Sequence, residues 1–137
     1  MAAYLLDTNI LSDIVKNPTG PAAETHQRLT VDPGIEVFTS IVVACEMQFG
    51  AIKKGSLKLT ARVNELLEGI RIASLDVGAD QAYARLRADL EHRGQPIGQN
   101  DMLIAAHAIA LNAILVTDNV REFKRIKGLR VENWLRT

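Results

Sequence analysis

Four acidic residues of this 137-residue chain stand where a negative charge is costly or chemically useful. Asp7 and Asp118 each follow directly on an apolar run of the kind that forms a buried strand. Glu46 and Asp101 lie in segments of helical periodicity whose neighbouring positions are apolar. Because an ionised carboxylate is rarely buried without a partner, each of the four is a candidate for a chemical role.

Three of these acids also have a simpler interpretation. Asp7 is well placed to cap the helix that follows it, and Asp101 lies in a first helical turn, where the helix dipole favours a carboxylate. Asp118 fits a turn ahead of Asn119 and Glu122, which have the spacing of a capping box. Taken singly, none of the three requires a catalytic site.

Glu46 is harder to explain as a surface charge. Its neighbours one helical turn away are Val42, Val43, Phe49 and Gly50, so we expect it on an apolar stripe. No lysine or arginine lies close by in the sequence to pair with it. A metal or catalytic role and a long-range salt bridge are the two remaining explanations.

The four acids together point to a metal site. In an open α/β sheet, ligands collect at the carboxyl ends of the strands, where these carboxylates can be focused on one point. Such a cluster needs a counter-charge, and Mg²⁺ or Mn²⁺ is the natural one because both prefer oxygen ligands. A carboxylate-bound metal with open water positions supports hydrolysis of a phosphodiester. No Ser-His-Asp or Cys-His arrangement competes, and we expect His26, His92 and His107 in packing or surface roles.

The elements that must position these acids alternate along the chain, strand after helix, which predicts a parallel sheet with helices on both faces. The expected strands are 4–6, 36–39, 71–75, 113–117 and 129–131. The expected helices are 10–17, 21–32, 41–54, 57–67, 79–93, 100–111 and 119–125. Ser40 is the expected N-cap of the third helix, and Gly55 its C-terminal stop.

Length and composition bound the class of protein. A chain of 137 residues with 47% hydrophobic content builds one core, so we expect a single domain over residues 1–137. The single cysteine, Cys45, excludes an intrachain disulfide and a multi-cysteine zinc site, and its apolar surroundings predict a small core residue. No apolar run is long enough to cross a bilayer and no signal peptide is recognisable, so a soluble, cytoplasmic protein is expected.

Read in order, these residues resemble a PIN-domain ribonuclease, and specifically a VapC toxin of a type II toxin–antitoxin pair. The strand-end sequence Asp7-Thr8-Asn9 alone is a weak signal, whereas the ordered set of segments is specific. The resemblance spans essentially the whole chain and rests on Glu46 and on the segments 5–12, 96–108, 115–119, 122–123 and 128–134.

The resemblance implies a three-layer α/β/α fold around a small parallel sheet, with a catalytic magnesium or manganese site. The implied metal ligands and catalytic acids are Asp7, Glu46, Asp101 and Asp118, with Asn9 and Asn119 in supporting positions. The implied activity is hydrolysis of RNA phosphodiesters, in transfer RNA or ribosomal RNA, which inhibits translation. The implied partner is a VapB antitoxin whose C-terminal segment fills the active groove, and homodimers are usual in the family.

Positive charge is concentrated in two stretches, although the formal net charge is zero. Residues 53–62 contain four basic residues and no acid, and residues 121–137 contain six basic residues against two acids. Such runs are often only solvated faces, and contact with RNA phosphates is the alternative. The candidate RNA-binding residues are Lys53, Lys54, Lys58, Arg121, Lys124 and Arg125.

Two rival hypotheses are weighed against the ribonuclease. A phosphatase of the haloacid dehalogenase type also begins with a strand-end Asp, but it needs a second Asp two residues later, where this chain has Asn9. A non-catalytic α/β nucleic-acid-binding regulator, working in complex with an antitoxin, accounts for the basic stretches. It does not account for the apolar setting of Glu46 and Asp101. Manganese-dependent cleavage of RNA by the isolated chain separates these hypotheses.

Overall fold

The structure is a computed structural model that describes residues 2–136, and these residues form five strands and seven helices. In chain order the elements are β1 (Ala2–Leu6), α1 (Thr8–Lys16), α2 (Pro21–Thr30), β2 (Ile35–Ser40), α3 (Ile41–Lys54), α4 (Leu57–Gly69), β3 (Arg71–Ala73), α5 (Ala79–His92), α6 (Gln99–Ala110), β4 (Ile114–Val116), α7 (Val120–Phe123) and β5 (Val131–Glu132).

The strands form one parallel sheet in the order β3-β2-β1-β4-β5. The first strand is therefore the central one, and Leu5 lies between Phe38 of β2 and Leu115 of β4. A central parallel strand is covered on both faces, which explains why its sequence is a continuous apolar run without alternation. The predicted parallel α/β sheet is confirmed.

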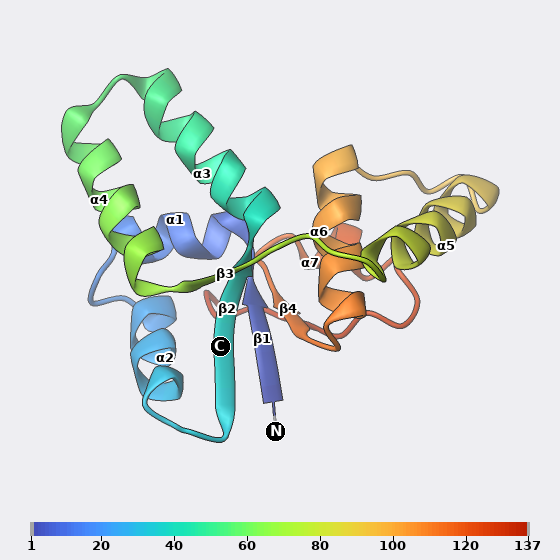
Figure 1. Cartoon of the computed structure of the whole chain (residues 1–137), viewed down its shortest axis with the longest axis horizontal. Helices are drawn as coiled ribbons and strands as arrows, with labels where there is room; N and C mark the ends of the chain where they lie inside the picture. The colour runs from blue at the N-terminus through green and yellow to red at the C-terminus, as the bar shows by residue number, and fades with distance from the viewer. Residues whose placement is uncertain (1, 137) are drawn as a thin grey trace.

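Helices cover the sheet from both sides (Figure 1). Helices α1 to α4 gather on one side, whereas α5, α6 and α7 lie on the other, with α3 and α4 forming a projecting helical hairpin. Side chains such as Leu6, Ile10, Ile104 and Phe123 are fully buried between these layers. The predicted three-layer arrangement is therefore also confirmed. None of the helices between residues 2 and 136 has the length and apolar character needed to span a bilayer.

The ends of α3 follow from local chemistry. The Ser40 hydroxyl accepts a hydrogen bond from the Val42 N–H (3.0 Å), which satisfies one of the free donors of the first turn. At the other end Gly55 adopts the left-handed conformation (φ 69°), in which a residue without a Cβ is favoured. Both boundaries were predicted, and both are confirmed.

The expected elements all exist, but their boundaries differ from the observed ones by up to two residues, and the expected burial of Cys45 was wrong. The third strand ends at Ala73 instead of residue 75. The last strand begins at Val131, because Gly128 takes a positive φ (82°) and the chain is still turning before it pairs with β4. Cys45 is exposed instead of buried, because α3 directs Val43, Ala44 and Met47 to the core and leaves this side to solvent.

A buried histidine fastens α6 to the start of α3. His107 is 1% exposed; its Nδ1 lies 2.7 Å from the Ser40 hydroxyl and its Nε2 lies 3.1 Å from the Ser74 carbonyl. A carbonyl only accepts, so Nε2 carries the hydrogen and the Ser40 hydroxyl donates to Nδ1. Burial lowers the pKa of His107, which favours this neutral ring. The expected packing role of His107 is therefore confirmed.

We predict that His107→Ala lowers the free energy of unfolding by about 2–4 kcal/mol, because it removes a buried ring and leaves the Ser74 carbonyl without its donor. Urea unfolding of the purified proteins measures this loss. His92→Ala, on the exposed end of α5, is the matched control and should change the value by less than about 0.5 kcal/mol. A His107→Ala loss no larger than that of the control would contradict the argument.

Candidate active site

Asp7 lies at the carboxyl end of the central strand and is held by hydrogen bonds on both carboxylate oxygens. Its side chain is only 4% exposed. Its Oδ1 accepts from the Thr8 N–H (2.7 Å), and its Oδ2 accepts from the Thr117 hydroxyl (2.8 Å) and from the Asn9 amide (3.5 Å). Asp7 is thus both the N-cap of α1 and a buried acid, so the two sequence interpretations are compatible.

Burial raises the pKa of Asp7, and the negative charge of Glu46 raises it further. The hydrogen bonds from Thr117 and Thr8 act in the opposite direction because they stabilise the ionised form. The ionised state of this buried carboxylate therefore depends on the donors that surround it.

Thr117 joins the ends of β1 and β4. Besides donating to Asp7, its hydroxyl oxygen accepts from the Asn9 amide (3.2 Å) and from the Asn119 N–H (3.0 Å). Asn9 also accepts the Asp118 N–H on its Oδ1 (2.9 Å). Asn9 therefore ties the first acid to the loop after β4, where the sequence predicted a supporting role. Thr117 was missed, although a polar residue ending an apolar strand is a visible signal.

Glu46 projects from the second turn of α3 toward the same edge of the sheet. Its Oε1 accepts from the Thr8 hydroxyl (2.6 Å), and its Oε2 accepts from the Asn100 amide (3.4 Å) at the start of α6. The expectation that Glu46 lies on a buried apolar stripe was wrong in part. Val43 is fully buried, but Phe49 is 65% exposed, so Glu46 stands at the boundary between core and solvent.

Asp101 is the acid whose ionisation the structure perturbs most clearly. Burial raises its pKa to about 6, and the charges of Asp7, Glu46 and Glu122 contribute to the shift. Asp7, Glu46 and Glu122 are therefore each close enough to Asp101 for their charges to disfavour its ionisation. Three of these four acids were predicted, and Glu122 is an addition.

Glu122 escaped the sequence analysis because its spacing to Asn119 suggested only a helix cap. In the structure the Asn119 amide donates to Glu122 Oε2 (3.0 Å) at the start of α7. Asn119 thus holds an acid that faces the site, instead of satisfying the helix backbone. The position of Glu122 one helical turn after Asp118 is the signal that could have found it.

Asp118 stands apart from this group. Its side chain is exposed, and its Oδ1 accepts from the Asn133 amide (2.9 Å) and from Arg136 Nε (3.3 Å). These hydrogen bonds lower its pKa, which is opposite to the shift of Asp101. The structure therefore joins Asp118 to the site through its backbone N–H, while its carboxylate faces the C-terminal segment.

The basic candidates are spread around the site. Lys54 lines a pocket that also contains Glu46, whereas the Lys53 ammonium lies 5.8 Å from the centre of the Phe49 ring. Arg125 donates to the Pro96 carbonyl (3.2 Å), so part of its guanidinium already has a structural hydrogen bond. The remaining candidates, Lys58, Arg121 and Lys124, are exposed.

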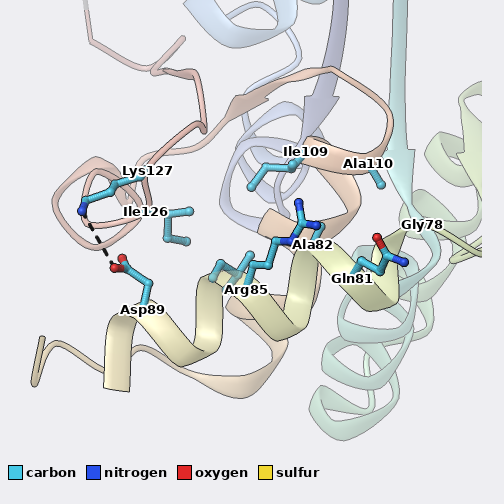
Figure 2. Close-up of a pocket in the computed structure, with 10 residues that line it drawn as sticks. Gly78, Gln81, Ala82, Arg85, Asp89, Ile109, Ala110, Ile126 and Lys127 are labelled. Carbon is cyan, nitrogen blue, oxygen red and sulfur yellow. Dashed lines mark ion pairs between the residues drawn. The ribbon is translucent and has the colours of Figure 1, made fainter. Parts of the chain in front are cut away.

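A cavity of about 430 Å³ between α5, the end of α6 and residues 126–127 is unrelated to these acids (Figure 2). The carboxylate in its lining, Asp89, pairs with Arg93 (2.7 Å) and Lys127 (3.9 Å). The Arg93 hydrogen bond lowers the pKa of Asp89, so this acid already has its counter-charge. The lining of this cavity therefore does not resemble a second acidic site.

The acid group has the donor chemistry of a hard-cation site. Asp7, Glu46, Asp101 and Glu122 supply only carboxylate oxygens, and a cation among them would relieve the repulsion that raises the pKa of Asp101. As the side chains stand, no three His, Cys, Asp or Glu residues within positions 2–136 are close enough together to hold a metal ion. The four carboxylates are suitable ligands for a hard cation, but their side chains would have to rotate to bind the same ion.

The fold and this acidic edge agree with the comparisons with known proteins. The PIN domain family matches residues 4–129, which defines the class of the protein. Ribonuclease VapC2 of Rickettsia felis is 37% identical over 132 residues, 96% of this chain and 97% of its own length. The tRNA(fMet)-specific endonuclease VapC of Shigella flexneri is 34% identical over 138 residues, 98% of this chain and 99% of its own length.

The crystal structure of VapBC2 from Rickettsia felis bound to a DNA fragment from the promoter contains a chain that superposes on this one with a TM-score of 0.88. The two chains are 35% identical, and the match covers 96% of this chain and 98% of the other. The chain therefore belongs to the VapC family of PIN-domain ribonucleases, as the sequence predicted.

We predict that Asp101→Asn stabilises the metal-free protein at neutral pH. The folded-state pKa of about 6 lies above the ordinary 3.8, so the loss of stability caused by ionisation grows as the pH rises from about 4 and is complete above about pH 6. The gain should be about 1–2 kcal/mol at pH 7.5, after a discount for partial exposure, and should disappear as the pH falls toward 4.

Chemical unfolding in the presence of a chelator, repeated from pH 4 to pH 8, measures this dependence. Glu68→Gln removes an exposed carboxylate on α4 and is the matched control. If Asp101→Asn raised the free energy of unfolding equally at pH 4 and pH 8, ionisation of Asp101 would not destabilise the folded protein.

Proposed function

We propose that this protein is a metal-dependent endoribonuclease that acts as the toxin of a type II toxin–antitoxin pair. The observation that carries the proposal is the group of carboxylates at the carboxyl edge of the sheet, in a chain of the VapC family. We treat residues 1–137 as one domain, since one sheet and one core contain all the elements between residues 2 and 136.

We propose Asp7, Glu46, Asp101 and Glu122 as the residues that hold Mg²⁺ or Mn²⁺. When bound, the metal would lower the pKa of a water molecule and stabilise negative charge on the phosphoryl oxygens. The carboxylates fit this task by their oxygen chemistry and by the repulsion among them, which a cation offsets. The predicted role of Asp118 as a metal ligand is not part of this proposal, because its carboxylate accepts hydrogen bonds from Asn133 and Arg136.

The residues around the acids act as positioning groups in this proposal. Thr117 and Asn9 fix the Asp7 carboxylate, and Thr8 and Asn100 fix Glu46 from two different helices. These donors stabilise the ionised carboxylates at the edge of the sheet, and side-chain rotation from there would bring the carboxylates onto a cation.

The proposed substrate is transfer RNA, with ribosomal RNA as the second possibility. The support is the relative from Shigella flexneri, which is named as specific for tRNA(fMet). Lys53, Lys54, Lys58, Arg121 and Lys124 are exposed and are proposed to bind RNA phosphates around the site. Affinity should then fall with salt, because each phosphate contact releases counterions. Arg125 is the weakest member of this set, since it also bonds to Pro96.

The proposed partner is a VapB-type antitoxin. The support is that the superposable chains come from complexes such as VapBC2 from Rickettsia felis and VapBC-1 from nontypeable Haemophilus influenzae. The Rickettsia complex is bound to DNA from its promoter, so we also propose that the pair contributes to transcriptional regulation. We also propose that the chain forms a homodimer, because homodimers are usual in the family it resembles. An enzyme that acts on transfer RNA is expected to work in the cytoplasm.

We predict that Asp7→Asn reduces cleavage of RNA by roughly 1,000-fold or more while the protein stays folded, because it removes an anionic ligand and preserves shape. Cleavage of a tRNA pool with Mn²⁺, and with chelator as a blank, measures the activity. Far-ultraviolet circular dichroism checks the fold. Asp32→Asn, in the exposed turn before β2, is the control and should retain full activity. Substantial cleavage by Asp7→Asn would exclude the proposed site.

We predict that Glu122→Gln reduces cleavage much more than Asp118→Asn does, by roughly 100-fold against less than about fivefold. The reason is that Glu122 contributes charge at Asp101, whereas the Asp118 carboxylate is engaged by Asn133 and Arg136. Initial rates at saturating Mn²⁺ compare the two variants directly. If Asp118→Asn reduced cleavage more than Glu122→Gln does, Asp118 and not Glu122 would be the fourth metal ligand.

A further inference from the structure

A second cavity adjoins the acidic site without being part of it. It has a volume of about 210 Å³ and lies between α1, α3 and α4, inside the helical layer that includes the projecting hairpin. Thr8 and Glu46 belong to its wall, and these are the two residues joined by the 2.6 Å hydrogen bond at the acid edge. A group seated in this cavity therefore lies directly beside a proposed cleavage site.

The lining has two chemically distinct parts. Met47, Val63 and Ala51 are buried and form an apolar interior, to which the Ser12 hydroxyl adds a polar group. This hydroxyl donates to the Met47 sulfur (3.5 Å), which is a weak acceptor, so it is easily redirected to a ligand.

The charged part consists of two ammonium groups. Lys16, from the last turn of α1, and Lys54, from the last turn of α3, both line the cavity and are exposed. Among residues 2–136, neither of them is engaged in an ion pair. Glu46 is the acid in the lining, at the end that adjoins the site. The cavity therefore combines an apolar interior with positive charge.

We propose that this cavity binds one nucleobase of the RNA substrate, next to the phosphodiester that is cut, with Lys16 and Lys54 on the neighbouring phosphates. This inference rests on the proposed ribonuclease function. The volume is below the roughly 300–1,000 Å³ of pockets for drug-sized ligands and suits a single flat ring. The apolar interior would accept the ring face of a base, a surface that every base presents.

The two lysines favour RNA over a peptide as the occupant. A nucleotide carries an apolar ring face and a negative phosphate, which match the two parts of the lining. An antitoxin side chain matches only the apolar part, unless its own segment is acidic. Lys16 is a residue that the sequence analysis did not single out, since it stands outside both basic stretches.

Gly50 allows the cavity to be filled without removing any contact. It lines the cavity, and a Cβ built on it meets no atom within 4 Å. Gly50→Leu should therefore block the cavity while α3 stays intact, since leucine is a better helix former than glycine. Gly50→Ala also favours the helix, adds little obstruction and is the matched control.

Binding of RNA is measured in the cleavage-inactive Asp7→Asn background, so that the probe is not consumed. The first probe is an unfractionated tRNA pool. We expect Gly50→Leu to weaken binding by about tenfold or more, which is about 1.4 kcal/mol, and Gly50→Ala to change it less than about twofold. Lys16→Gln and Lys54→Gln should each weaken binding, whereas Lys127→Gln, on the far cavity of Figure 2, should not. Unchanged binding by Gly50→Leu overturns the proposal.

The second probe is an RNA oligonucleotide spanning the mapped cleavage position, with one abasic nucleotide placed in turn on each side of the cut. We expect one abasic position to weaken binding by the parent protein about tenfold and to have no further effect on Gly50→Leu. If every abasic position weakens both proteins equally, the cavity does not hold a base and the proposal is wrong.

The two proposals fail in distinguishable ways. If the wild-type chain cuts no RNA, the ribonuclease function fails, while the binding of the tRNA pool still decides whether the cavity contacts RNA. If Gly50→Leu binds RNA normally but no longer binds a VapB-type antitoxin, the cavity is a peptide site and the nucleobase assignment is overturned.

Discussion

Burial of the Asp7 carboxylate is the constraint on which the rest of the site depends. A carboxylate that is 4% exposed must be satisfied locally, and its donors come from the next residue, from α1 and from the end of β4. The donor from β4 is Thr117, which is placed only because β1 and β4 are paired in register. The same threonine then fixes Asn119, and Asn119 holds Glu122. Through these contacts the buried Asp7 carboxylate is linked to Glu122, an acid that is distant in the sequence.

Helix α3 connects the acid edge to the rest of the molecule. Its first residues are anchored by Ser40, which both caps the helix and donates to the buried His107 of α6. Glu46 and Asp101 are carried by these same two helices, so the buried Ser40–His107 contact fixes the relative position of the two acids. Residues whose own side chains never face RNA can therefore determine the shape of the site.

Features governed by local chemistry were predictable from the sequence. The parallel sheet followed from apolar runs without alternation, and the ends of α3 followed from Ser40 and Gly55. Asp7, Glu46 and Asp101 were identifiable because their settings make a charge expensive. The exposure of Cys45 and Phe49 was not predictable, because both lie in an apolar run and only the packing of the other layers decides which face of α3 is covered.

The sequence also did not show which acid joins Asp7, Glu46 and Asp101 at the site. Asp118 and Glu122 are four residues apart, and their sequence settings gave no reason to prefer Glu122. The difference arises from Asn133 and Arg136, which come later in the chain and engage the Asp118 carboxylate. Such long-range competition for a side chain has no signature in the local sequence.

The order of the strands also has a consequence for synthesis on the ribosome. β1 is made first, yet it lies in the centre of the sheet beside β4, and Asp7 is separated by 110 residues from the threonine that holds it. Thr8 and Asn9 are next to Asp7 as soon as they are made, whereas Thr117 follows only after β1, β2, β3 and β4 have all been synthesised. A growing polypeptide cannot complete the acidic edge before α6 and α7, which carry Asp101 and Glu122, have been made. The carboxylates can therefore act as one group only after residues 101–122 have left the ribosome.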